Sequence, residues 1–369
     1  MKKMSVAILL VLFIIGACSS NQNQEFQEEK QDQTGVENNQ SANEERTETE
    51  LTVLAENLDV PWSITKHQNA FYITERPGGI VKIENEEMER QTISLEKDQS
   101  DAAEAGLLGF VLTPDFSESN LAYGYYTYTD ESGQFNRVVT LRLSDEGWQE
   151  EEVLIDEIPS GTYHHGGRLE IGPDDKLYVT TGDASNAEIA QDLNSLGGKI
   201  LRMELDGSIP EDNPESDSYV YSYGHRNPQG IAWSSSGEIY ASEHGNSAND
   251  EINNIGAGEN YGWPIIEGNQ EREGLVSPLF TSGDDTTWAP SGMAYSDEKL
   301  YVAALRGTAV LEFDLETNQH KEVVTGLGRI RDVWTEDNYL YFISNNTDGR
   351  GSAEVNDDKL YRIGMSELD

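Results

Sequence analysis

The sequence Leu177-Tyr178-Val179 is one copy of a short pattern that decides the fold of this 369-residue chain: an apolar residue, a tyrosine, and an apolar or small residue. The pattern occurs six times, with its tyrosines 51, 55, 62, 61 and 40 residues apart, at Tyr72, Tyr123, Tyr178, Tyr240, Tyr301 and Tyr341. Several copies lead into a second alternating segment, such as Gly79-Ile80-Val81-Lys82-Ile83. Six strand repeats, with almost no segment of helical period, predict an all-β protein: a six-bladed β-propeller of four-stranded antiparallel blades over residues 51–369.

A pair of β-sandwiches is the alternative architecture for such a chain, but it would not require one strand core to return six times. In a propeller, residues 51–58 and 359–365 can close the ring in the last blade. Propellers bind ligands where loops from all blades converge at the mouth of the central channel. Residues that are distant in the sequence can therefore form one site.

The chain is strongly acidic, with 68 Asp and Glu residues, 25 Lys and Arg residues and a net charge of -43. The first 20 residues carry +2 and residues 21–50 carry -7, which leaves -38 on residues 51–369. Such a surface repels nucleic acid and anionic lipid headgroups, so we expect neither as a partner of the folded part. A neutral ligand or calcium is not repelled, whereas an anionic ligand needs a basic pocket of its own.

The N-terminus predicts export. A basic start, Met1-Lys2-Lys3, precedes an apolar run over 6–15 that is too short for a usual membrane span. Ile15-Gly16-Ala17-Cys18 then resembles the lipobox of bacterial lipoproteins, and Cys18 is the only cysteine. We interpret residues 1–18 as a lipoprotein signal peptide and 19–50 as a flexible acidic linker. We expect the protein to be exported and lipid-anchored at the outer side of the cell membrane, or in the periplasm or at the outer membrane; an ordinary signal peptide is the alternative.

The stretch from His164 to Asp183 predicts a hairpin with a candidate general base. Leu169 and Ile171 alternate with polar residues, a Pro-Asp-Asp turn follows, and an apolar run leads back to Asp183. Such a hairpin brings His164 and Asp183 to the same end of two neighbouring strands. A histidine beside a carboxylate can act as a base whose tautomer the carboxylate fixes. Two ordinary turn residues are the alternative interpretation.

Several arginines indicate an anion site. Arg226, in the loop Tyr223–Gly230, carries a planar guanidinium suited to carboxylates, although it could instead bond loop carbonyls. Arg329 and Arg331 lie two residues apart in a β segment. Two neighbouring arginines are costly unless an anion lies between them, and either a ligand or Asp332 could be that anion. Arg306 adds a cation at the rim.

Oxygen ligands gather in three segments, 242–246, 250–253 and 260–264, which join carboxylates and amides with tight turns. Ca²⁺ accepts carboxylates and backbone carbonyls in flexible geometry, so these segments form a candidate calcium site. A solvated acidic loop is the simpler alternative.

Together these motifs resemble the soluble pyrroloquinoline quinone (PQQ)-dependent aldose sugar dehydrogenases of the glucose/sorbosone dehydrogenase type. The resemblance is carried by Val60-Pro61-Trp62, Thr74–Gly78, Gly106–Gly109, His164–Asp183, Asp206–Pro210, Tyr223–Gly230, Asn260–Pro264 and Arg329–Val333. The family fold is a six-bladed propeller. The resemblance implies PQQ- and calcium-dependent oxidation of an aldose at C1 to the lactone, with electrons passed to an external acceptor, a quinone or redox protein.

The resemblance also implies roles for single residues. His164 matches the general base, Asp183 the carboxylate that orients it, and Arg226 a residue at the reactive carbonyl. Glu104 matches a substrate-side position, where some members have Gln. Matches to cofactor-binding positions are Asn227, Thr287, Arg306, Arg329 and Arg331. Matches to calcium ligands are the backbone of Gly245 and Asn246 at the cofactor, and Glu251 with the backbone of Tyr261 at a second, structural site.

Some residues depart from the family pattern. Asn246 stands where many members have Pro, and Arg306 replaces a Lys of some members. His165 has no assigned role. Two other functions stay open: a calcium-dependent propeller lactonase, which would not need the arginine pair, and a non-catalytic propeller that binds sugars or proteins.

Overall fold

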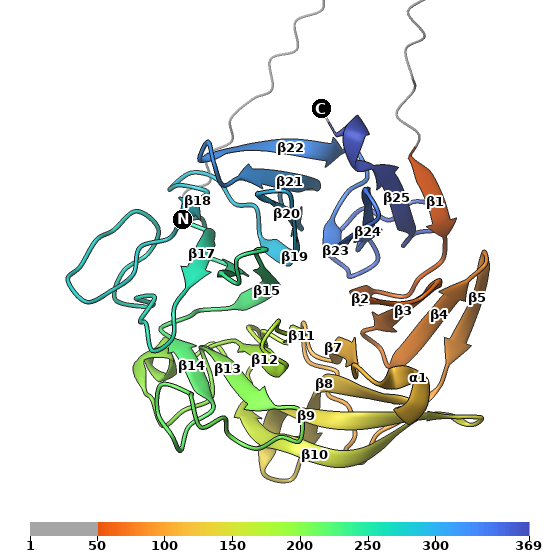
Figure 1. Cartoon of the computed structure of the whole chain (residues 1–369), viewed down its shortest axis with the longest axis horizontal. Coiled ribbons are helices and arrows are strands. Elements are labelled where there is room, and N and C mark those ends of the chain that lie inside the picture. The colour runs from red at the N-terminus through yellow and green to blue at the C-terminus, as the bar shows by residue number, and fades with distance from the viewer. Residues whose placement is uncertain (1–50, 369) are drawn as a thin grey trace, which may run out of the picture. The chain divides into compact units, whose positions relative to one another are not determined.

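Six β-sheets stand around a common centre in residues 51–368, the part of the chain that the computed structural model describes (Figure 1). The predicted signal peptide (1–18) and linker (19–50) lie outside the described residues. Each sheet is one blade, and the strands nearest the centre in Figure 1 are β2, β7, β11, β15, β19 and β23. The predicted all-β, six-bladed propeller is confirmed.

Each blade is an antiparallel meander. Blade 1 consists of β2 (Pro61–His67), β3 (Ala70–Glu75), β4 (Gly79–Glu84) and β5 (Glu87–Gln91). Blade 2 consists of β6 (Ile93–Ser94), β7 (Leu107–Leu112), β8 (Leu121–Asp130), β9 (Gly133–Ser144) and β10 (Gly147–Pro159). Blade 3 consists of β11 (Leu169–Ile171), β12 (Lys176–Thr181), β13 (Lys199–Glu204) and β14 (Val220–Tyr223).

The other three blades follow the same plan. Blade 4 consists of β15 (Pro228–Trp233), β16 (Ile239–Glu243), β17 (Glu251–Ile255) and β18 (Phe280–Thr281). Blade 5 consists of β19 (Pro290–Ser296), β20 (Lys299–Ala304), β21 (Ala309–Asp314) and β22 (Gln319–Thr325). Blade 6 consists of β23 (Ile330–Glu336), β24 (Tyr339–Ser344), β25 (Leu360–Gly364) and β1 (Thr52–Ala55).

The repeated tyrosine marks the second strand of every blade. All six of these tyrosines are buried, with 2–8% of their surface exposed. The apolar core is divided into six clusters, and each cluster lies between two adjacent blades. Because a four-stranded sheet is apolar on both faces here, each blade needs a neighbour on either side. The pattern therefore predicts the ring as well as the strands.

Two blades carry additional features. In blade 2 the two-residue β6 adds to the outer edge of the four-stranded meander, parallel to β10. In blade 6 the first described strand, β1, pairs with the last, β25, as the sequence predicts, with Val53 opposite Tyr361. The helices are short: α1 (Phe116–Ser119) and two 3₁₀ turns, η1 (Ala187–Gln191) and η2 (Met365–Glu367). None of the helices formed by residues 51–368 has the length and apolar character that a membrane crossing requires.

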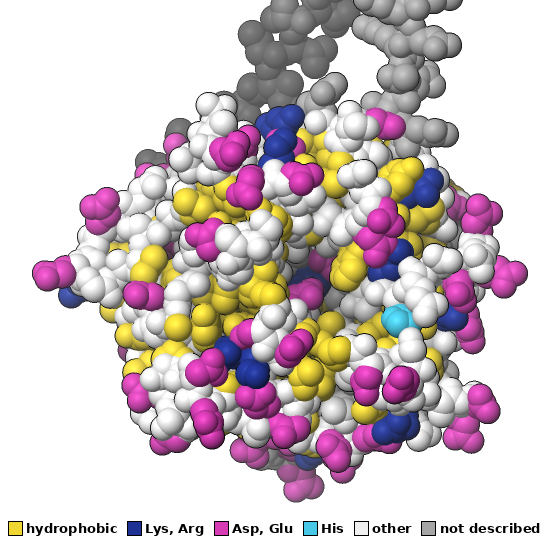
Figure 2. Space-filling view, in the orientation of Figure 1, with side chains coloured by type: hydrophobic (Ala, Val, Ile, Leu, Met, Phe, Trp, Pro, Cys, Tyr) yellow, Lys and Arg dark blue, Asp and Glu magenta, His cyan; other side chains and the backbone are white. Residues whose placement is uncertain are grey.

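Figure 2 shows acidic side chains spread over one face of the molecule and around its rim, far outnumbering the basic ones, with a hollow at the centre. The folded part thus presents the acidic surface that the composition predicts. A cluster of arginines inside such an acidic protein therefore needs an explanation of its own.

Candidate active site

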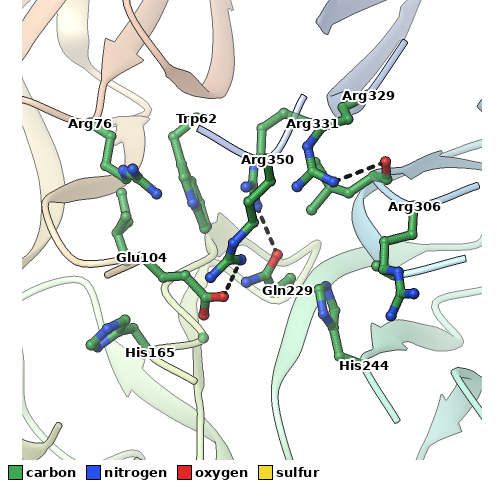
Figure 3. Close-up of a pocket in the computed structure, with 14 residues that line it drawn as sticks. Trp62, Arg76, Glu104, His165, Gln229, His244, Arg306, Arg329, Arg331 and Arg350 are labelled. Carbon is green, nitrogen blue, oxygen red and sulfur yellow. Dashed lines mark hydrogen bonds and ion pairs between the residues drawn. The ribbon is translucent and has the colours of Figure 1, made fainter. Parts of the chain in front are cut away.

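A cavity of about 410 Å³ lies among the first residues of the innermost strands and the loops near them. Figure 3 shows the polar side chains that point into it. Five are arginines, and one, Glu104, is a carboxylate. The arginines are Arg76, Arg306, Arg329, Arg331 and Arg350. A cationic cavity inside so acidic a protein indicates an anionic ligand.

Arg331 is the least compensated of these arginines. Its side chain is only 4% exposed and bonds the neutral groups Gln229 Oε1 at 3.0 Å and Ser291 Oγ at 3.4 Å, while its Nε has no partner. Burial first, and then the charge of Arg329, lowers its pKa to about 9. No carboxylate of residues 51–368 forms an ion pair with it, so the structure leaves a buried cation for a ligand to neutralise.

Arg329 already has a partner. Its Nε and Nη2 donate to Asp348 Oδ2 at 3.1 and 2.8 Å, and its Nη1 donates to the Leu305 carbonyl at 3.2 Å. The alternative that Asp332 lies between the two arginines is wrong, because Asp332 accepts a bond from Arg168 at 2.8 Å instead. Arg306 has an exposed side chain at the rim, as expected.

The predicted base and carboxylate meet. The hairpin forms as β11 and β12, and His164 Nδ1 lies 2.7 Å from Asp183 Oδ1. Asp183 is 1% exposed and also accepts bonds from Trp263 Nε1 at 2.8 Å and from the Ser185 backbone. When the Asp183 carboxylate accepts a hydrogen bond from Nδ1–H, the Nε2 of His164 is unprotonated and can accept a proton from a substrate.

Glycines bring the two halves of this dyad together. A Cβ on Gly182 would lie 2.0 Å from the His164 carbonyl oxygen, and one on Gly166 would lie 2.5 Å from the Thr180 carbonyl oxygen. Side chains at these positions would push the histidine loop away from β12. Gly166 itself lines the cavity. The loop of residues 160–168, which carries His164 and is called the dyad loop below, therefore lies at the edge of the cavity.

Two further predicted residues, Arg226 and Asn227, contact the dyad or its loop, and a third, Thr287, does not. Arg226 lies over the Trp263 ring at 5.3 Å and donates from Nη1 to the His244 carbonyl at 3.2 Å, so it does bond a loop carbonyl. Burial lowers its pKa. Asn227 Oδ1 accepts the Gly166 N–H at 2.9 Å. Thr287 is not among the residues that line the cavity, and its hydroxyl donates to Asp250 Oδ2 at 2.8 Å.

Glu104 lines the cavity and contacts both the dyad loop and Arg350. Its Oε1 accepts a bond from Arg350 Nη1 at 2.5 Å, and its Oε2 accepts the His164 backbone N–H at 3.3 Å. Burial alone would raise the pKa of Glu104, but the bond and charge of Arg350 outweigh it and hold the pKa at about 2. The carboxylate is therefore ionised at neutral pH.

The predicted calcium ligands are partly brought together. Gly245, Glu251 and Tyr261 line a second, very small cavity of about 10 Å³ with Glu243 and Glu267. Burial, followed by the charge of Glu243, raises the pKa of Glu251 to about 8. Asn246 is exposed and outside this lining. No group of three or more His, Cys, Asp or Glu side chains within residues 51–368 has the arrangement of a metal site.

Four charged or titratable cavity residues had no role in the sequence analysis: Arg76, His165, His244 and Arg350. Arg76 lies in a motif that carries the resemblance, and His244 in a candidate calcium segment. Burial lowers the pKa of His244 to about 4, so its ring is neutral. His165 is held by Ser160 Oγ at 3.1 Å and the Ala103 carbonyl at 3.2 Å, which suits a structural role. Arg350 follows Asn345-Asn346-Thr347-Asp348-Gly349, a polar run directly after a strand that could have marked it.

The chain is similar in sequence to known sugar dehydrogenases. The chain is 33% identical over 258 residues to the quinoprotein glucose dehydrogenase B of Acinetobacter calcoaceticus, covering 61% of this chain but only 54% of that enzyme. It is 32% identical over 340 residues to the aldose sugar dehydrogenase YliI of Escherichia coli, covering 81% and 91% of the two chains.

Solved structures of sugar dehydrogenases are also similar to this chain. The PQQ-bound form of aldose sugar dehydrogenase from Streptomyces coelicolor matches with a TM-score of 0.80 and 33% identity, over 86% of this chain and 98% of that one. The sequence profile of the family described as Glucose / Sorbosone dehydrogenase matches residues 58–361, a range that begins before blade 1 and ends within β25 of blade 6. The chain therefore belongs to the glucose/sorbosone dehydrogenase family.

Proposed function

We propose that the protein is a PQQ-dependent dehydrogenase that oxidises aldose sugars at C1 to the lactone. The charge balance of the large cavity carries the proposal. Arg329 is paired with Asp348 and Arg350 with Glu104. Arg76, Arg306 and Arg331 have no carboxylate partner among the described residues. PQQ is a planar quinone with three carboxylates, so its charge matches the three unpartnered guanidinium groups.

The same balance favours a neutral substrate. Once three carboxylates neutralise three arginines, the remaining two arginines are already paired. A sugar with no charge then meets no uncompensated cation. The names of the relatives, a glucose dehydrogenase and an aldose sugar dehydrogenase, support this substrate class.

The proposed chemistry divides between cofactor and protein. PQQ, when bound, supplies an ortho-quinone that accepts two electrons as hydride. His164 Nε2 takes the proton of the anomeric hydroxyl, and the C1 hydrogen leaves with its bonding electron pair as hydride while C1 and its oxygen form the lactone carbonyl. Asp183 holds the Nδ1 proton and stabilises the imidazolium that results. Arg226, which lies over the Trp263 ring, would stabilise the negative charge that develops at the reactive carbonyl of the quinone.

A calcium requirement belongs to the proposal. Gly245 and Asn246 would supply backbone oxygens at the cofactor, and Glu251 with the Tyr261 backbone would supply a structural site. The carboxylates of buried Glu243 and half-buried Glu251 adjoin a cavity whose volume suits a single ion, which fits a cation there. Of the proposed calcium ligands, Glu251 already accepts two hydrogen bonds within the protein, from the Gly268 N–H at 2.9 Å and from Asn253 Nδ2 at 3.2 Å.

We further propose that electrons leave to an external quinone or redox protein, and that the enzyme works outside the cytoplasm on a lipid anchor at Cys18. The acceptor is proposed from the family resemblance, and the location from the N-terminal sequence alone. A lactonase would have no use for the arginine-lined cavity, which favours the dehydrogenase.

The test is reconstitution. The purified protein, mixed with PQQ and Ca²⁺, should reduce a redox dye in the presence of glucose or another aldose, and samples without PQQ should not. If PQQ binds but no member of a broad aldose panel is oxidised, the proposed substrate class is wrong.

A further inference from the structure

The loop of residues 345–358, between β24 and β25, reaches from blade 6 to the cavity. Its two ends are tied together, because Asp358 accepts bonds from the Asn346 N–H at 2.6 Å and the Thr347 N–H at 3.2 Å. Its Asp348 side chain is 2% exposed and holds Arg329. The loop is therefore fixed against a cavity arginine at its base.

Arg350 extends from this loop across the cavity to the opposite side, as Figure 3 shows. Its Nη1 bonds Glu104 Oε1, 246 residues away in the sequence, and its guanidinium lies 5.7 Å from the Tyr163 ring. Tyr163 directly precedes His164. The second oxygen of Glu104 accepts the His164 N–H. Arg350 is therefore linked to the dyad loop in two ways, directly at Tyr163 and indirectly through Glu104.

We propose that Arg350 is a positioning residue for the sugar: it fixes the Glu104 carboxylate as a hydroxyl acceptor beside the His164 loop. This inference rests on the proposed function, and it adds a residue to which neither the family resemblance nor any comparison gives a role. Arg350 acts through Glu104 and does not itself contact the reacting atoms. Its 46% exposed side chain keeps the pair at the solvent side of the cavity.

The surroundings of Glu104 explain why one arginine matters. The charged and titratable groups that face it are Arg350 from the 345–358 loop, Arg76 after β3, His164 and His165 before β11, His244 after β16 and Arg331 on β23. Only Arg350 forms an ion pair with it. Without that bond, burial would dominate and raise the pKa of Glu104, so that acidification would protonate the carboxylate and weaken it as a hydroxyl acceptor.

The experiment compares Arg350→Ala, Arg350→Lys and Glu104→Gln with wild type, all loaded with PQQ and Ca²⁺. Arg142→Ala is the matched control, because Arg142 is 44% exposed and also pairs with a carboxylate, Glu151, but on the outer strands of blade 2. For Arg350→Ala we expect KM for the aldose to rise about tenfold, the effect of one charged hydrogen bond, while kcat changes by less than about threefold. Arg350→Lys should recover part of the loss.

Two further readouts separate positioning from structure. Wild-type kcat/KM already has an acid limb from the general base His164, and in Arg350→Ala it should gain a second ionisation on that limb; Glu104→Gln should raise KM without the second ionisation, and the double variant should add little to Glu104→Gln alone. PQQ affinity, titrated without sugar, and the urea midpoint should match wild type and Arg142→Ala.

The proposal is overturned if Arg350→Ala keeps the wild-type KM and pH profile, or if its loss is in PQQ affinity or stability instead. Failure of the proposed function is a separate result, because the wild-type protein itself would then oxidise no aldose.

Discussion

Replacing Arg331 with Met should weaken cofactor binding while leaving the cofactor-free protein at least as stable. The pKa of Arg331 falls from a usual 12.5 to about 9 because the charge is buried and lies near Arg329. At 1.36 kcal/mol per pKa unit, the folded state disfavours the charged form by up to about 5 kcal/mol. A folded pKa below the unfolded one means that this cost is fully present below pH 9 and declines as pH rises from 9 towards 12.5. At neutral pH the whole cost therefore applies.

Methionine keeps much of the packing on Trp62 and removes the charge, but it loses the bonds to Gln229 and Ser291. We therefore expect a smaller net gain, about 1–3 kcal/mol in the free energy of unfolding. The measurement is urea unfolding of the PQQ-free protein at pH 7. A parallel titration should show PQQ affinity reduced at least about a hundredfold, since a buried charge-assisted partner is gone.

Arg168→Met is the matched contrast. Arg168 is also buried, 3% exposed, and lies over the same Trp62 ring at 4.4 Å, but its charge is paired with Asp332 at 2.8 Å. Its removal leaves a buried carboxylate unpaired and should cost about 3–5 kcal/mol. If Arg331→Met proves as destabilising as Arg168→Met, or if it binds PQQ normally, the charge argument is refuted.

The remaining predictions concern the dyad and the calcium site. His164→Ala should bind PQQ with near-normal affinity but lose about 10²–10⁴ in kcat; turnover close to wild type would show that another group is the base. Asp183→Asn should lower kcat by a similar factor, because the Nδ1 proton loses its carboxylate, and should leave the melting temperature within a few degrees; unchanged kcat would contradict the dyad. Excess chelator should lower the thermal midpoint of wild type but not that of Glu251→Gln, and equal shifts in both would exclude Glu251 as a ligand.

The fold was open to prediction from the sequence because its signal is local and repeated. Each repeat tyrosine is the middle of a second strand, and no distant information is needed to find it. The hairpin from His164 to Asp183 is equally local, since β11 and β12 are joined by a short turn. The dyad distance of 2.7 Å follows from that register.

The pairing of charges was not open to prediction in the same way. Arg329 has Asp332 three residues away but bonds Asp348 in another loop, because strand alternation and the bend at the start of β23 turn Asp332 towards Arg168. Arg350 and Glu104 meet only because blades 2 and 6 face the same cavity. Thr287 matched a cofactor position, yet its hydroxyl bonds Asp250. Such contacts depend on how the loops close over the ring, which a single sequence does not encode in its spacing.

The pairing of β1 with β25 sets the order in which the chain can mature. A ribosome makes β1 at the start of the propeller and its partner about 300 residues later. In the interval β1 is an unpaired edge strand, the kind of surface that recruits other chains. Loop-closure entropy grows only with the logarithm of the intervening length, so the wait costs little once both strands exist. A chain that stops before residue 360 can never complete blade 6, and premature termination should therefore yield an aggregating product even when five blades are intact.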